Sequence, residues 1–449
     1  EKKTMTEVTQ ELEVVNSQEP IWTRDPGSVS KEEYTDFYKG LSSDWEAPAF
    51  VKHSKAEGQL VFTSLLFLSK RAPFDMFSGG EDKKHNNVRL HARRVFIQDN
   101  CKELMPEYLS FVQGVVDSDD LPLNISREVL QGNQVIRVMR KHLVKKTLEA
   151  IAALSEDEEA YKSFYLAFSK NLKLGIHEDK SNQAKLASLL RYATTRTGEG
   201  MTSLESYVSR MKEGQEAIYY ITGDSHESVA TSPFIEQLVQ HDYEVLLMTD
   251  AIDEYAMQQL KEFGGKKFVC VTEEGMVLPG GPSQEVRDAY EPLCKLAKEV
   301  LGDQVEKVVV SGRIATSPCC LVTSQYGYSA NMERILKAQA LRDSQSMMMV
   351  ASKKIMEINP NDPIIQGLLK SATPSKDAIW MLYEVALLTS GFALQKPTLF
   401  AARIHKLLAL GLGYAPEQAD VDEPEEVPTP TMDKSETKAE EDSTMEEVD

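Results

Sequence analysis

Negative charge is gathered at one end of this chain, and that end limits the part that can fold. Residues 420–449 contain thirteen Asp or Glu and two Lys, and so hold −11 of the net charge of −20. The same stretch has three prolines and no aromatic residue, so it cannot bury enough apolar surface to fold. We therefore expect a disordered acidic tail over 416–449. The remainder is too long for one core, and two or three domains are expected.

Strand and helix patterns alternate along the folded part. We expect an α/β unit over 20–155, in which strands 59–68 and 88–98 pair and a long helix runs from Ser126 to Leu154. A polar helical connector over 156–215 and a small α/β unit over 216–275 follow, with strands at 217–222, 245–249 and 267–272.

A Pro-Gly-Gly-Pro linker at 279–282 then opens a mixed α/β domain over 284–415. Its expected strands are 305–311 and 321–324, and its expected helices begin near Val286 or run over 331–341, 376–389 and 397–410. The fold class is thus multidomain, α/β and α+β: two α/β units joined by a helical connector, then a mixed α/β dimerisation domain that ends in a helical bundle.

The last two predicted helices point to self-association. Leu382, Val385 and Ala386 belong to a helix that is apolar on more than one face, and Ile404, Leu407 and Leu408 belong to the next one. Apolar surface of this extent needs a cover, and a second copy of the chain is the economical one. We expect a homodimer through a four-helix bundle.

One residue breaks a local rule. Arg127 follows Ser126, the expected N-cap of the long helix, and so places a cation where the helix dipole favours anions. The N-terminus of a helix can bind phosphate, and an added arginine strengthens such an anion site. The alternative is an exposed arginine that Glu128 neutralises. A basic face on the same helix (Arg137, Arg140, Lys141, Lys145 and Lys146) is interpreted as solvated.

The C-terminal residues carry a second candidate site. Asp449 holds two carboxylates behind Glu446 and Glu447, while Met445 and Val448 add apolar contact. A basic groove on a partner can clamp such an end. The alternative is a solubilising tail that happens to end in Asp.

Several functions are disfavoured. The sequence has no phosphate-binding G-x-x-x-x-G-K-[ST], no G-x-S-x-G and no H-E-x-x-H, which argues against a self-contained enzyme. Five cysteines without a C-x-x-C argue against a disulfide framework and a metal site, and favour a reducing compartment. The negative charge disfavours nucleic acid, and no apolar run is long enough for a membrane span.

Nine segments, in order along nearly the whole chain, resemble the cytosolic ninety-kilodalton heat-shock protein family. They are PIWTR (20–24), RAPFDMF (71–77), VVDSDDLPLNISREVLQ (115–131), NLKLGIHED (171–179), IYYITG (218–223), AIDEY (251–255), VEKVVVS (305–311), SANMERILKAQALRD (329–343) and the terminal MEEVD.

This resemblance implies an ATP-dependent molecular chaperone of the heat-shock response. It implies that the chain is the middle and C-terminal part, with 1–19 as the end of a linker, and that an N-terminal domain outside it binds ATP with Mg²⁺. Arg127 resembles the family's arginine that reaches the γ-phosphate, Gln131 resembles its partner, and Asn124 lies on the same catalytic loop.

The resemblance also implies partners. Unfolded or metastable clients would contact Trp22, Phe74 and Phe77, and a stripe of Tyr328, Met332 and Leu336, although a stripe with that spacing also fits a core. Tetratricopeptide-repeat co-chaperones would bind Met445–Asp449, activating co-chaperones the middle domain, and the location would be cytoplasmic. An ATP-independent holdase or a co-chaperone scaffold is the alternative.

Overall fold

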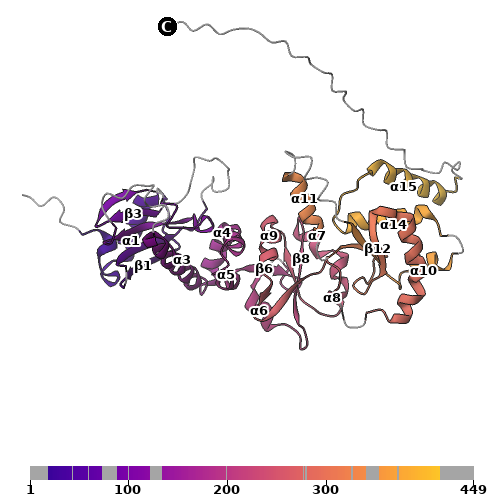
Figure 1. The fold of residues 1–449 in the computed structure, drawn as a ribbon, viewed down its shortest axis with the longest axis horizontal. Helices are drawn as coiled ribbons and strands as arrows, with labels where there is room; N and C mark the ends of the chain where they lie inside the picture. The colour runs from indigo at the N-terminus through magenta and orange to yellow at the C-terminus, as the bar shows by residue number, and fades with distance from the viewer. Residues whose placement is uncertain are drawn as a thin grey trace, which may run out of the picture. The chain divides into compact units, whose positions relative to one another are not determined.

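The computed structural model describes residues 19–414, apart from 43, 59, 73–87, 100, 122–133, 199, 277, 279–280, 325–326, 340–352 and 372–373. The chain divides into two compact units, residues 1–393 and 394–449. The first unit contains a five-stranded, a six-stranded and a three-stranded sheet, which follow one another along the sequence (Figure 1). The predicted multidomain mixture of α/β and α+β structure is confirmed; the exact domain boundaries stay a prediction.

The first sheet differs from the expected pairing. Its order is β1 (Phe50–Ala56), β2 (Phe62–Leu68), β5 (Val112–Ser118), β3 (Val88–Ala92) and β4 (Val95–Gln98). The predicted pair 59–68 and 88–98 is therefore wrong, because β5 lies between β2 and β3. Segment 88–98 is itself a hairpin, and its turn residues Arg93 and Arg94 have φ of 47° and 68°. Non-glycine residues seldom adopt such angles, so an Arg-Arg turn gives little sequence signal.

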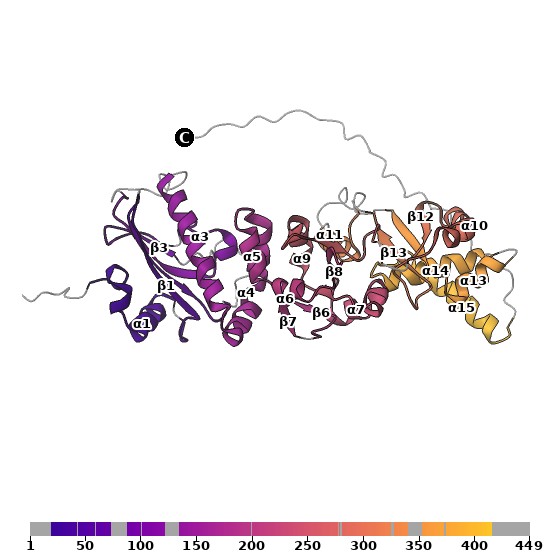
Figure 2. The same ribbon diagram turned by 90° about the horizontal axis from the view of Figure 1, so that it is seen from below.

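Helices cover both faces of this sheet (Figure 2). On β2, Leu65 and Phe67 pack in a cluster with Tyr38 of α1 (Lys31–Ser42). Leu66 and Leu68 point to the opposite face and join the core cluster that includes the inner face of α3 (Gln134–Leu154). The predicted long helix is thus confirmed from residue 134 on, and its expected start lies outside the described residues.

Segment 156–215 begins with helices, as expected of the helical connector, but it is not polar throughout. α4 (Glu158–Glu178) buries Phe164, Phe168 and Leu172 in the core cluster, and α5 (Gln183–Leu189) follows. The Phe111 and Phe168 rings stack with centroids 4.3 Å apart. Because charged residues lie between the aromatic ones along α4, its composition is polar although its apolar residues form one stripe. β6 (Arg191–Thr194), β7 (Met201–Ser203) and α6 (Leu204–Ser209) complete the segment.

The second sheet has the order β10 (Glu262–Phe263), β11 (Lys266–Cys270), β8 (Ala217–Thr222), β9 (Val245–Met248), β6 and β7, with β11, β8 and β9 parallel. This confirms the three predicted strands of the small unit. Its helices are α7 (His226–Ala230), α8 (Glu236–Gln240) and α9 (Ala251–Gln259).

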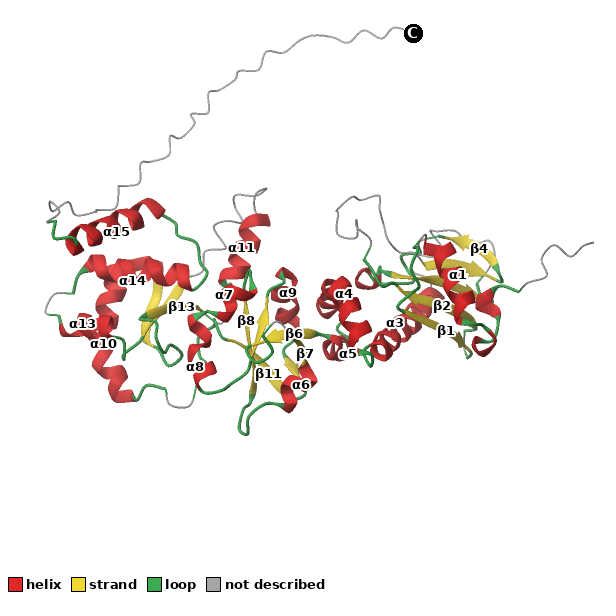
Figure 3. Ribbon diagram, turned by 180° about the vertical axis from the view of Figure 1, so that it is seen from behind, coloured by secondary structure: helices red, strands yellow, loops and turns green. Residues whose placement is uncertain are grey.

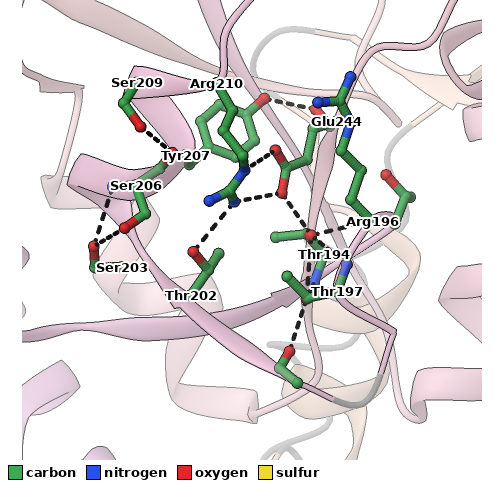
Figure 4. A network of polar contacts seen from close by, with 12 residues as sticks. Thr194, Arg196, Thr197, Thr202, Ser203, Ser206, Tyr207, Ser209, Arg210 and Glu244 are labelled. Atoms are coloured by element: carbon green, nitrogen blue, oxygen red, sulfur yellow. Dashed lines mark hydrogen bonds and ion pairs between the residues drawn. The ribbon is translucent and has the colours of Figure 1, made fainter. Parts of the chain in front are cut away.

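A polar network holds the start of β9 (Figure 4). The buried carboxylate of Glu244 accepts hydrogen bonds from Arg210 at 2.8 and 3.1 Å and from the Thr194 hydroxyl at 2.7 Å. Arg210 also donates to the Thr202 hydroxyl. The Glu244 carboxylate therefore connects Arg210, at the end of α6, to β6, and Arg210 extends the connection to β7. The hydrogen bond to Glu244 raises the pKa of Arg210.

The third sheet has the order β12 (Val305–Val310), β14 (Lys354–Ile358), β13 (Cys319–Thr323), and β14 was not anticipated. Its helices are α10 (Gln284–Leu301), α11 (Ala330–Gln339), α13 (Pro363–Lys370) and α14 (Lys376–Thr389), shown in red in Figure 3. α15 (Pro397–Gly411) belongs to the second unit. The expected helices 376–389 and 397–410 are confirmed.

Candidate functional site

Part of the predicted site lies outside the described residues. This holds for the catalytic candidates Asn124, Arg127 and Gln131, for Phe74 and Phe77, and for the tail residues Met445, Glu446, Glu447, Val448 and Asp449. The roles assigned to them stay predictions. The site that can be built from geometry is the surface around Trp22.

Trp22 lies in a short 3-10 turn (Ile21–Thr23) before α1 and is half-buried. Its indole N–H donates to the carboxylate of Asp117 at 3.0 Å, and Asp117 is itself buried at the end of β5. The ring lies 5.9 Å from that of Phe37 and 5.0 Å from that of His91. A satisfied polar atom and two ring contacts fix the indole, so the part left in solvent is a preformed apolar surface.

One exposed residue extends this surface, and it was not predicted from the sequence. Phe96 on β4 is 55% exposed, and its ring lies 5.6 Å from that of His91, so the aromatic contacts run from Trp22 through His91 to Phe96. The neighbouring Val95 is also exposed, but it pairs with Ala92 of the core cluster and so lies on the opposite face of the sheet. A hairpin prediction for 88–98 would have placed Phe96 on an edge strand, where exposed apolar side chains are unusual. We call Trp22 and Phe96 the apolar surface.

Two imidazoles next to the apolar surface favour the neutral form. Burial lowers the pKa of His91, and the opposing effect of Asp117 does not restore it. His53, which contacts the Trp22 carbonyl at 3.0 Å, also has its pKa lowered by burial. Both imidazoles are therefore neutral at pH 7. This arrangement can bind an apolar segment, and nothing in it activates a nucleophile.

The predicted C-terminal stripe divides into exposed and buried residues. Tyr328 is exposed and Leu336 is half-buried, but Met332 is only 5% exposed. A direct client contact at Met332 therefore disagrees with the structure, and the core alternative fits this residue. The start of α11 is fixed by Glu254 of α9, which accepts hydrogen bonds from Ser329 and Asn331.

The dimerisation candidates divide in the same way. On α14, Val385 is exposed and Leu382 half-buried, whereas Ala386 is buried. Packing of Ala386 against its own chain removes it from a dimer contact, which corrects that prediction. On α15, Leu407 and Leu408 are more than half exposed and Ile404 is half-buried.

No group of three or more His, Cys, Asp or Glu in the described part of the chain is placed to hold a metal ion. Among the helices of that part, none is long and apolar enough to cross a bilayer.

Comparison with known proteins identifies relatives over most of the chain. The family model described as Hsp90 protein matches residues 1–443. Heat shock protein 83 of Leishmania donovani is 52% identical over 427 residues, which cover 93% of this chain and 94% of that protein. The endoplasmin homolog of Caenorhabditis elegans is 43% identical over 91% of this chain, and heat shock protein 90-5, chloroplastic, of Arabidopsis thaliana is 42% identical over 92%.

The chain spans 56% and 54% of the length of these last two relatives. The match of the family model to nearly the whole chain, together with identities above 40%, leaves no other assignment. The chain belongs to the Hsp90 family of molecular chaperones.

Proposed function

We propose that this chain is the client-binding and dimerising portion of an ATP-dependent chaperone, and that clients bind at the apolar surface. The observation that carries the proposal is the exposure of Phe96 next to a fixed Trp22. Adjoining apolar groups on the surface of a folded scaffold often mark a site where another protein binds. An unfolded chain offers apolar side chains without a fixed shape, which such a surface accepts.

ATP hydrolysis is the second part of the proposal. Arg127 would clamp charge on the γ-phosphate, with Gln131 and Asn124 beside it, while ATP and Mg²⁺ are held by a separate N-terminal domain. Two observations support this division. The sequence has no phosphate-binding loop motif of the G-x-x-x-x-G-K-[ST] type. Relatives such as the endoplasmin homolog are nearly twice as long as the matched region, which leaves room for another domain.

The remaining proposals concern assembly and location. We propose a homodimer to which α15 contributes Leu407 and Leu408 and α14 contributes Val385, because these side chains are exposed. Tetratricopeptide-repeat co-chaperones would bind Met445–Asp449, and activating co-chaperones would bind the domain that contains the first two sheets. Heat shock protein 83 is the most similar of the relatives named above, which favours a cytoplasmic location.

The client site is tested by aggregation of a heat-denatured protein in the presence of the chain. Phe96→Ser should reduce protection at least ~10-fold, as expected when a central anchor is lost. The matched control is Leu166→Ser, since this residue is similarly apolar and exposed but lies on α4. Equal protection by the two variants would rule out the apolar surface.

ATP hydrolysis is tested with the N-terminal ATP-binding domain of a longer relative fused to the chain. Arg127→Ala should slow turnover by ~10²-fold or more with little change in nucleotide affinity, because a charge clamp acts mainly in the transition state. Lys162→Ala, at an exposed position of α4, is the control and should have little effect. Unchanged turnover in Arg127→Ala, together with full aggregation protection without ATP, would establish the alternative, an ATP-independent holdase.

A further inference from the structure

A basic cavity lies beside α3, away from the apolar surface. It encloses about 660 Å³ between α3, the turn at residues 106–108 and the loop that joins α4 to α5. The basic residues that line it are Arg137, Arg140, Lys141, Lys145 and Lys185. Four of them repeat at helical spacing on α3, so they share one face. The sequence analysis interpreted this face as solvated, but the structure shows that it borders a concavity.

These five cations have no ion-pair partner among the residues that the structure describes. Within the described part of the chain, no carboxylate lies within ion-pair distance of any of them, whereas Lys146 on the adjacent part of α3 pairs with Glu149 at 2.9 Å. Unpaired cations on a shared concave wall repel one another, and low-dielectric walls concentrate their field. The cavity therefore favours an anion.

The two acids of the cavity do not cancel this charge. Asp179 is already hydrogen-bonded to neutral donors, namely the Tyr108 hydroxyl at 2.8 Å and the Asn182 amide at 2.8 Å, so its carboxylate is used to fix the turn. Burial raises the pKa of Glu178, with a further contribution from Glu107, although His177 and Arg140 act to lower it. With both acids ionised, five cations and two anions leave a net charge of +3 (5 − 2).

The floor of the cavity is shaped in advance. Tyr108 and Val144 are buried apolar contacts in its lining. Tyr108 packs against Gly175 of α4 so closely that a Cβ there would lie 2.7 Å from its ring. Since the aromatic ring is held by this contact and by Asp179, a ligand meets a fixed floor and need order only the long basic side chains.

We propose that this cavity binds a small anion that carries several phosphoryl groups. Arginine presents planar donor pairs that match phosphate oxygens, and a phosphoryl group brings up to two charges into a compact volume. A cavity of this size holds one small molecule. An acidic peptide spreads single charges along an extended chain, which suits an open groove better. The clustered phosphoryl groups could belong to a free metabolite or to a lipid headgroup.

The test is a calorimetric titration of the full chain with inositol hexakisphosphate. We expect one ligand per chain with micromolar affinity that weakens as NaCl is raised, because counterions screen the cations. Arg140→Ala with Lys145→Ala should weaken binding at least ~10-fold. Lys31→Ala with Lys39→Ala removes the same charge from exposed positions on α1 and should bind as the wild type does.

Two further arms identify the source and the class of ligand. Flotation with vesicles that contain phosphatidylinositol bisphosphate, with the same variants, shows whether a headgroup also enters the cavity. Binding in either arm that depends on Arg140 and Lys145 supports the proposal. No binding in either arm, equal losses in the two double variants, or tighter binding of an oligoglutamate peptide than of inositol hexakisphosphate would overturn it.

Discussion

Lys173 offers the sharpest test of how the first two sheets are joined. This lysine of α4 is buried, and its ammonium lies 2.7 Å from Asp250 and 2.9 Å from Asp253, at the start of α9. It also lies 4.9 Å from the centre of the Tyr192 ring. Burial opposes its charge, but Asp253, Tyr165 and Asp250 more than offset this and raise the pKa of Lys173.

Lys173→Met keeps the length of the side chain and removes the charge. Asp253 is fully buried, and it would then keep only two weak hydrogen-bond donors. They are the Tyr192 hydroxyl at 3.3 Å and the backbone amide of Asp250, the N-cap residue of α9, at 3.2 Å. Loss of one partner from a buried pair costs ~3–5 kcal/mol, and the two remaining donors favour the lower end. At ~2–4 °C per kcal/mol, Tm of this transition should fall by ~6–12 °C.

The assay is thermal unfolding followed by circular dichroism, with hydrogen exchange of α4 and α9 to assign the transition, because a chain of several domains does not unfold in one step. Lys162→Met, at an exposed position of α4, is the matched control. Adding Asp253→Asn to Lys173→Met should restore part of the lost Tm. Equal Tm values for the two Lys→Met variants would refute the reasoning.

The pH dependence gives an independent check. Burial raises the pKa of Asp253, Lys173 opposes this, and removal of Lys173 should raise it further. A carboxyl whose folded pKa exceeds its unfolded value stabilises the fold at low pH and loses that contribution as pH rises through the folded pKa. The Tm deficit of Lys173→Met should therefore shrink as the pH is lowered from 7 to 5.

Three further predictions follow from other contacts. Glu236 accepts hydrogen bonds from the amides of Ala315 and Thr316, both at 2.8 Å; burial raises its pKa, but these bonds outweigh burial and lower it. Its contribution is thus present at neutral pH and lost as pH falls through the folded pKa, so Glu236→Ala should cost ~1 kcal/mol at pH 7 and less as the pH is lowered, measured by exchange of the 315–317 amides. Leu407→Glu with Leu408→Glu should give monomers in sedimentation, and a dimer at micromolar concentration would exclude α15 as the interface. Asp449→Ala should weaken binding to a tetratricopeptide-repeat co-chaperone ~10-fold or more by calorimetry, since one of two terminal carboxylates is lost.

Hydrophobic periodicity predicted the secondary structure correctly where a segment is covered on one side or buried throughout. It identified β8, β9 and β11, and it gave the bounds of α14 as the structure has them. It failed where long-range pairing decides: β5 follows β3 in sequence but inserts between β2 and β3. β14 enters the third sheet between β12 and β13, although it comes last of the three, and no local pattern encodes that order.

The site residues, too, could be predicted from the sequence only in part. Trp22 was named from the resemblance, but the indole bond to Asp117 and the neighbouring Phe96 come from strands far apart in sequence. Met332 and Ala386 were assigned to surfaces because a helical stripe does not tell which of its residues face the chain itself. The basic face of α3 was identified correctly, yet its concavity depends on the turn that begins at Pro106 and on the loop after α4.

In the first unit, apolar clusters and buried ion pairs contribute to the fold in different ways. One apolar cluster runs from the first sheet through α4 to Leu246 and Met248 of β9, and another from β9 to Ile355 of β14, so burial is continuous between successive sheets. Apolar burial is non-directional, and many arrangements of the same apolar residues would bury about as much surface.

The ion pairs lie at the same junctions: Lys173 with Asp253, and Arg313 with Glu357 and the carbonyl of Val271. A buried pair adds little net stability, but it penalises every arrangement in which one partner is left alone. On this argument, the charges select one packing among those that the apolar clusters allow. Lys173→Met should then broaden the range of arrangements as well as lower Tm, whereas Lys173→Met with Asp253→Asn should regain part of the Tm without regaining the single arrangement.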